Sequence, residues 1–240
     1  MVTLYDFCRI RLNEGRKDRM VLNSPSRPRL GTVNRMMDFF AFFRRRGPIA
    51  SPEALADFID SNAAFLVQKG IYEYARARAA HYSKVLFKEQ TFQNAVENSR
   101  WRAFPLGLAM VAEAAEGLLR PAAGDNRQAQ VEALSTLVLS IFDRYPVPDL
   151  LGGPTWGELR IELARRLQLI GLHAPKLAMD IPEPFAQSYF DLMPIHENLR
   201  RAEFPTLHNY MRVTMCNIHD ELDKRLEPKA VAGLLIGHSV

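Results

Sequence analysis

The chain has 240 residues, of which 48% are hydrophobic and 24% are charged, and this ordinary globular composition allows a sizeable buried core. No run of about 18 uncharged apolar residues occurs and the N-terminus lacks the apolar core of a signal peptide, so neither a membrane span nor a secretory leader is expected. Two distant cysteines, Cys8 and Cys216, exclude a disulfide framework and a paired-cysteine metal site, and we expect a cytoplasmic protein.

Positive charge is concentrated at the N-terminus. Residues 1–46 hold 11 Lys and Arg against 4 Asp and Glu, whereas the remaining 194 residues carry a net charge of −3. The body of the protein is therefore not expected to bind nucleic acid. A solvated tail is the main expectation for the basic segment, and contact with an anionic membrane surface or with RNA is the alternative.

Residues 1–30 are expected to form a flexible basic segment, because they have no clear apolar period and end in a run that includes Pro25 and Pro28. An alternative hypothesis places the native start at Met36 or Met37, so that residues 1–35 would not belong to the native protein. The intact mass of the native protein distinguishes the two.

The pattern of residues 31–46 predicts an amphipathic helix with aromatic side chains followed by three arginines. Gly47 and Pro48 are expected to end this helix. Such a helix can lie in a membrane interface. It can also pack on the body with its arginines in solvent. The candidate contacts with a membrane or a partner are Phe39, Phe40, Phe43, Arg44, Arg45 and Arg46.

The first helix of the body is predicted to begin at Ser51, which offers an N-cap oxygen, followed by Pro52 in the first turn. Apolar residues then recur at steps of three and four from Leu55 to Ile71, which indicates an amphipathic helix. Gly70 would either weaken this helix or divide it. Trp101, Tyr72, Tyr74 and Tyr82 are expected either to line a cavity or to pack with their polar tips in water.

Two helices are predicted next, one from about Lys88 to Trp101 and one that restarts at Phe104-Pro105. Residues 121–125 have the composition of a loop. Asp125 and Gln128 resemble a capping box for a further helix that ends before Pro146.

Thr155 and Glu158 form a second capping-box pattern, and the helix that they open is predicted to stop at Gly171. After a proline-bounded connector, helices are expected over 186–201, interrupted at Pro194, and over 205–226, with a final helical turn from about residue 229. Residues 51–240 are thus predicted to be one all-α domain of about seven to nine helices.

The last long helix combines an apolar stripe with a polar flank. Its stripe, predicted to face the core, contains Leu207, Met211, Thr214, Ile218 and Leu222. The flank carries His208, Arg212, His219 and Asp223. His219 and Asp223 lie four residues apart and can touch, whereas His208 and His219 lie about 16 Å apart along the axis and cannot share one metal on a straight helix. His208, Arg212 and Asp223 are the candidate ligand-binding residues.

The dipeptide His219-Asp220 in a helical chain resembles the HD-domain phosphohydrolases, which are all-helical and bind divalent metal through an H…HD…D pattern. The resemblance implies that His196 or His208 supplies the first histidine. The final aspartate of the pattern has no counterpart, because no acidic residue follows Glu227. We therefore assign no metal and no cofactor. The candidate catalytic residues are His196, Glu197, His219 and Asp220.

Three functions remain open at this level. The signatures of a phosphate-binding loop, a serine-hydrolase elbow and a zinc protease are all missing, which favours a helical binding or assembly protein with a protein partner, self-association or a small ligand. A hydrolase with a His/Asp site on the C-terminal helices is the second. The third is a peripheral membrane protein anchored by residues 36–46.

Overall fold

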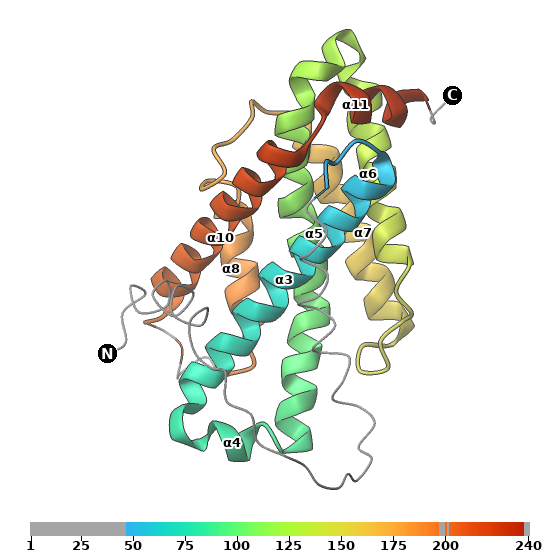
Figure 1. Ribbon diagram of the computed structural model, residues 1–240. Helices are drawn as coiled ribbons and strands as arrows, with labels where there is room; N and C mark the ends of the chain where they lie inside the picture. Colours follow the sequence, from blue (N-terminus) through green and yellow to red (C-terminus); the bar gives the residue numbers. More distant parts are fainter. Residues whose placement is uncertain (1–46, 197–199, 201, 238–240) are drawn as a thin grey trace, which may run out of the picture. The chain divides into compact units, whose positions relative to one another are not determined.

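The computed structural model describes residues 47–196, 200 and 202–237. Within these residues the protein is all-α, as predicted: seven helices of nine residues or more are present and no β-strand occurs. The helices are α3 (Pro52–Ala79), the short α4 (Ser83–Leu86), α5 (Gln90–Ala123), α6 (Arg127–Asp143), α7 (Gly152–Ile170), α8 (Glu183–Asp191), α10 (Phe204–Arg225) and α11 (Pro228–Gly237) (Figure 1).

Several predictions concern residues outside the described ranges. These are the flexible segment 1–30, the helix 31–46 with its aromatic and arginine contacts, the start at Met36 or Met37, and Glu197. They stay predictions. None of the described helices combines the length and the apolar composition needed to span a membrane.

The central element is α5, which contacts α3, α6, α7, α8, α10 and α11 (Figure 1). Every residue from 103 to 116 is buried. A helix that is apolar on all sides is stable only when other elements surround it, and α5 meets this condition. The other long helices therefore organise around its middle.

This burial explains why two predicted helices are one. The predicted restart at Phe104-Pro105 is wrong, because α5 continues through Pro105. An interior proline removes one backbone hydrogen bond and costs about 3 kcal/mol. Burial of the surrounding apolar side chains offsets that cost. The predicted loop over 121–125 is also wrong for residues 121–123, which belong to α5. The helix ends at Ala123, and Gly124 follows it with a φ of 53°.

Two capping predictions are wrong as well. Asp125 lies in a short 3-10 turn, and α6 begins after Asn126 with no side-chain cap. Thr155 lies inside α7, which already begins at Gly152. In contrast, Ser51 caps α3 as predicted: its hydroxyl oxygen accepts a hydrogen bond from the backbone N–H of Ala54 at 3.2 Å.

Gly70 does not divide α3, and its role is steric. A Cβ atom at this position would lie 2.8 Å from Cε1 of Tyr210 and would also overlap the hydroxyl of Tyr189. That hydroxyl donates a hydrogen bond to the carbonyl of Val67 at 3.0 Å. The glycine thus leaves room for α8 and α10 to pack on α3.

Gly107 brings α5 close to α3 in the same way. A Cβ atom there would lie 2.8 Å from Cγ2 of Val67 and 2.9 Å from the carbonyl oxygen of Ala63. The two long helices therefore approach closely along this face. Their opposing side chains just beyond the contact build the pocket described below.

The C-terminal part follows the prediction where the structure describes it, apart from the first residues of α8. The predicted stripe of α10 is buried along its whole length, and α11 packs with Val231, Ala232 and Leu235 inside. The predicted interruption at Pro194 is confirmed, since α8 ends at Asp191, although this helix starts at Glu183 and not at Ala186. Proline disfavours helical geometry in the residue that precedes it, which is consistent with this early stop. The predicted continuation to residue 201 lies largely outside the described residues and stays a prediction.

The beginning of the described body is tied to the end of α10. The N–H of Ile49 donates to the carbonyl of Arg225 at 2.7 Å, and the N–H of Glu227 donates to the carbonyl of Ile49 at 2.9 Å. This isolated parallel bridge between Ile49 and Leu226 is a local link and no sheet.

Candidate functional site

The predicted polar flank of α10 is used for packing at its first two positions. Nε2 of His208 lies 3.1 Å from Oε1 of Glu183 on α8, and the His208 ring stacks on Phe204 with ring centres 5.6 Å apart. Nε of Arg212 donates to the carbonyl of Met179 at 3.2 Å. These contacts join α10 to α8 and to the connector that precedes it.

The rest of the flank does not gather into a site. Among the described contacts, no hydrogen bond or ion pair joins His219 to Asp223, and Asp220 and Asp223 are exposed. Within the described part of the chain, no three His, Cys, Asp or Glu side chains lie close enough to hold a metal ion. His196 follows α8 and Glu197 lies outside the described residues, so their assignment as candidate catalytic residues stays a prediction.

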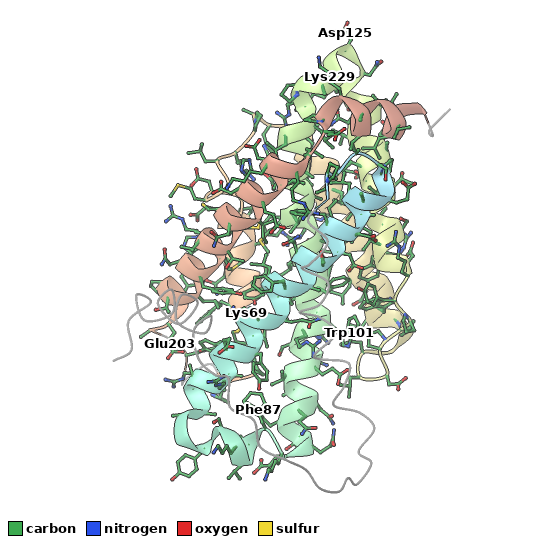
Figure 2. All side chains as sticks on the ribbon, viewed as in Figure 1. Lys69, Phe87, Trp101, Asp125, Glu203 and Lys229 are labelled. Atoms are coloured by element: carbon green, nitrogen blue, oxygen red, sulfur yellow. The ribbon has the colours of Figure 1, made fainter. Side chains whose placement is uncertain are left out.

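The tyrosines that were considered for a cavity have packing roles where their contacts are described. Tyr72 packs on Phe87 with ring centres 5.0 Å apart. The Tyr74 hydroxyl donates to Glu203, and Arg78 binds the same carboxylate at 2.9 Å (Glu203 is labelled in Figure 2). These interactions connect α3 to the beginning of α10. Tyr82 is largely exposed.

A buried charge cluster, which the sequence analysis did not single out, lies on the second half of α5. Glu116 is 1% exposed and accepts from Nε of Arg120 at 2.8 Å, while Nε of Arg127 lies 3.8 Å from it. Glu113 pairs with Nζ of Lys176 at 2.8 Å and lies 3.5 Å from Nε2 of His173. We call these six residues the paired cluster.

The paired cluster fixes the connector between α7 and α8. Arg120 donates to the carbonyl of His173 at 2.8 Å, and Arg127 donates to the carbonyl of Gly171. Each glutamate has a cationic partner, so the cluster acts as a structural clamp. A signal was present in the sequence, since Glu113 and Glu116 interrupt an otherwise apolar run.

A pocket lies between α3 and α5, at the end of α6. Together with the open solvent at its mouth, it has an empty volume of about 280 Å³. Positions 64, 67 and 68 share one face of α3, positions 100, 101 and 104 share the facing side of α5, and the last wall follows α6. The lining residues are Ala64, Val67, Gln68, Arg100, Trp101, Phe104 and Tyr145.

Aromatic rings form one wall of this pocket. Trp101 makes edge contacts with Tyr145, Phe104 and Trp156, at ring-centre distances of 5.6, 6.2 and 5.8 Å. Figure 2 labels Trp101 beside the loop that joins α6 to α7. Such tilted arrangements are the favoured geometry for aromatic pairs. The wall is therefore set by packing and does not depend on a ligand.

Tyr145 is also held from behind by Asp60, which lies one helical turn before Ala64 on α3. The Tyr145 hydroxyl donates to Oδ1 of Asp60 at 2.7 Å. Burial raises the pKa of the Asp60 carboxyl, and the hydrogen bond from Tyr145 and the charge of Arg144 counter part of that rise. Burial beside Asp60 also raises the pKa of Tyr145, so its hydroxyl stays protonated and keeps donating.

Arg100 is the charged residue of the pocket. Its Nε is buried without a hydrogen-bond partner, and it forms no salt bridge with any described carboxylate. Burial lowers its pKa, with a smaller opposing effect from Glu97. Removing a guanidinium from water without a partner is costly. The pocket thus contains a guanidinium that has no anionic partner within the described part of the chain.

Sequence reasoning identified Trp101 as a possible cavity residue but missed Arg100, Gln68 and Tyr145. Arg100 is one of 31 Lys and Arg residues, and nothing in its neighbourhood distinguishes it. Its special feature is the lack of a partner, which depends on residues distant in the chain.

No protein-family model matches the chain, and neither a curated protein nor a solved structure matches it. The chemistry of the pocket is therefore the basis for a functional interpretation.

Proposed function

We propose that the chain is a helical binding protein whose pocket between α3 and α5 takes a small organic ligand. One observation supports this most strongly: a concave, aromatic-lined site contains Arg100, whose Nε has no hydrogen-bond partner among the described residues. Small-molecule sites are typically apolar cavities with a few convergent polar groups. Arg100 and Gln68 are the convergent polar groups here.

The rigidity of the pocket walls supports the same proposal. Both long walls are interior segments of helices that pack closely at Gly107, and Tyr145 is fixed by Asp60 and by neighbouring rings. A site whose walls are already in place loses little conformational freedom when a ligand enters.

The lining chemistry favours binding over hydrolysis. The pocket presents one cation, one amide and one phenol, together with apolar side chains. Among the described residues, no His, Cys, Ser or carboxylate group lines it, and these are the groups that most often act as nucleophiles or general bases. The described residues also bring no metal ligands together elsewhere.

A fragment screen by ligand-observed NMR on the full chain tests the proposal. Gln68→Trp fills the pocket from its rim and should abolish the signals of fragments that bind there. Arg76→Trp places the same side chain on an exposed part of α3 and should preserve them. Fragments that bind wild type and Gln68→Trp alike would show that this pocket is not the binding site, and a screen without any hit would remove the proposed function.

A further inference from the structure

We infer that the turn between α3 and α5 is a contact surface for an anionic lipid membrane. We call this turn, residues 76–88, the basic tip. It places Tyr82 and Val85 against the lipid headgroups, with lysine and arginine side chains around them. The inference goes beyond the proposed pocket and does not depend on it. It also differs from the predicted anchor at residues 36–46, because it uses residues that the structure describes.

The basic tip differs in charge from the rest of the body. Residues 76–88 hold four Lys and Arg and no Asp or Glu, whereas the whole body, residues 47–240, holds 20 against 23. Three of the four cations are exposed to solvent: Arg76, Lys84 and Lys88. Within the described part of the chain, neither lysine takes part in an ion pair. The tip is therefore a positive region on a body of net negative charge.

Carboxylates near the tip neutralise only part of this charge. Glu203 binds Arg78 at 2.9 Å, and Glu73 lies 4.0 Å from Arg76. Glu89 is exposed just beyond the tip. The Arg76 side chain remains 62% exposed beside Glu73, so its charge is still available at the surface. Exposed pairs of this kind are weak and exchange readily with other partners.

The exposed apolar side chains of the tip lie close together in the chain. Tyr82 is 62% exposed and Val85 is 59% exposed. They are three residues apart, and Lys88 follows at the same spacing, which places the three side chains on one side of a helical backbone. The N–H of Lys88 donates to the carbonyl of Val85 at 2.9 Å, so helical bonding continues to this point. None of the four residues of α4 is buried.

Aromatic packing fixes the basic tip on the body. The ring of Phe87 lies 5.0 Å from that of Tyr72 on α3 and 5.1 Å from that of Phe92 on α5. Figure 2 labels Phe87 at this end, and Figure 1 shows α4 at the opposite end of the body from α11. The exposed side chains are therefore held outward at one end of the body, where a flat surface can contact them.

The exposed carboxylates at the end of α10 lie far from the tip. Asp220, Asp223 and Glu227 are exposed there, and the backbone of Ile49 joins this end to the start of α3. Helix α3 has 28 residues and is about 42 Å long. Interactions between exposed charges are screened over about 8 Å at physiological ionic strength. These carboxylates therefore do not oppose the approach of the tip to an anionic surface.

The shape and composition of the tip favour a membrane over a nucleic acid. Single-stranded nucleic acids follow a positively charged groove and stack their bases on aromatic rings. The tip is instead a turn at the end of two helices, and Val85 has no ring for stacking. The net negative charge of the rest of the body repels a long strand. Tyrosine and aliphatic side chains flanked by lysine and arginine are typical of contacts with a membrane interface.

Co-sedimentation of the full chain with lipid vesicles tests the inference. Vesicles of phosphatidylcholine with about 30% phosphatidylserine should bind the chain at least about tenfold more tightly than vesicles of phosphatidylcholine alone, because only the former attract lysine and arginine. A single-stranded oligonucleotide of about 20 nucleotides should bind more weakly than the anionic vesicles.

Paired variants assign the binding to the tip. Lys84→Glu/Lys88→Glu should weaken binding to the anionic vesicles by at least about tenfold, since each cation near such a surface contributes about fivefold. Lys224→Glu/Lys229→Glu is the matched control, because it changes the net charge equally at exposed positions near α11 (Lys229 is labelled in Figure 2). It should alter binding by less than about twofold. Residues 1–46 are the same in both variants, so a difference between them comes from the tip.

A second pair tests the apolar contact. Val85→Ser should weaken binding to the anionic vesicles by about threefold, because less apolar surface leaves water. Ile161→Ser changes another exposed aliphatic side chain, on α7, and should leave binding unchanged.

The inference is overturned if the full chain does not bind anionic vesicles, if it binds both kinds of vesicle equally, or if either tip variant binds as tightly as its control. Tighter binding of the oligonucleotide than of the anionic vesicles, lost in Lys84→Glu/Lys88→Glu, would also overturn it and would assign the tip to a nucleic acid. Each of these outcomes leaves the proposed function of the pocket standing, because the fragment screen measures it separately.

Discussion

Helix α5 carries two charged regions, one buried at Glu116 and one half-buried at Arg100, that differ in how the charge is paired. Arg100 and Glu116 lie 16 positions apart, about 24 Å along the helix. Glu116 is enclosed by Arg120 and Arg127, whereas Arg100 forms no salt bridge within the described residues. Buried charges that pair with each other fix the elements that carry them in one arrangement. A charge without a partner in the fold can instead pair with a bound ligand. The same helix therefore contains a structural clamp and a candidate binding group.

The largest expected effect comes from breaking the paired cluster. Glu116→Gln keeps the shape of the side chain but leaves two arginines without their buried counter-charge. We expect the free energy of unfolding to fall by about 3 kcal/mol, measured by urea denaturation. Glu132→Gln, an exposed change on α6, is the control and should alter it by less than about 0.5 kcal/mol. An equally small loss in Glu116→Gln would mean that the cluster is not a clamp.

The next effect concerns a buried polar contact without formal charge. Gly70→Ala should displace the Tyr189 hydroxyl from the carbonyl of Val67. Overpacking costs about 1–3 kcal/mol, and the better helix propensity of alanine recovers about 1 kcal/mol, so we expect a net loss of about 1–2 kcal/mol.

Thermal and urea unfolding of Gly70→Ala would measure this loss. Gly153→Ala is the matched control, because nothing lies within 4 Å of a Cβ at that position. The control should be neutral or slightly stabilising. Equal stability of the two variants would show that α3 and the tyrosines can shift apart without cost.

A smaller change of opposite sign is expected for the unpaired charge. Arg100→Met keeps much of the length of the side chain and removes a half-buried cation whose Nε has no partner among the described residues, so stability should stay the same or rise by up to about 1 kcal/mol. The measurement is again urea denaturation. A loss as large as that of Glu116→Gln would indicate a hidden structural role for Arg100 and weaken the distinction between the two regions.

The smallest effect is a pH dependence at the pocket wall. Burial raises the pKa of the Asp60 carboxyl in the folded state above 3.8, the ordinary value that the unfolded chain keeps. Between the unfolded-state pKa and the folded-state pKa, the folded state therefore binds more protons than the unfolded state. The contribution of Asp60 to stability therefore decreases as the pH rises through its folded-state pKa. Asp60→Asn stays neutral and can still accept from Tyr145, so the variant should gain stability relative to wild type over this range.

Urea unfolding of both proteins across this pH range measures the difference. Asp149→Asn serves as the control, because Asp149 is exposed and is not among the groups that shift the pKa of Asp60. A variant that becomes less stable relative to wild type as the pH rises would show that Tyr145 and Arg144 stabilise the Asp60 carboxylate more than burial penalises it.

Local patterns made much of the fold predictable. The stripe of α10 could be assigned because Leu207, Met211 and Ile218 repeat at helical spacing, and the start of α3 could be assigned because Ser51 and Pro52 form a local signal. The predictions failed where a distant contact overrode a local one. Pro105 is tolerated because α5 is surrounded, and Gly70 is required because Tyr189 and Tyr210 occupy the space of a side chain.

The contrast between local patterns and distant contacts is stronger at the candidate site than in the fold. The sequence directed attention to the histidines of α10, since dense polar residues on one helix are visible in a linear chain. The tertiary structure engages His208 and Arg212 in packing and directs attention to Arg100.

The sequence by itself determined that this protein is helical, where its apolar stripes lie and that its positive charge is concentrated in residues 1–46. These properties depend on residues within a few turns of one another. Only the tertiary structure decided that Glu116 is paired and that Arg100 has no salt bridge among the described residues, because the answer depends on what α3, α6 and the connector bring to α5. Whether a charge is satisfied is a property of the packed chain, and so is the pocket that Arg100 lines.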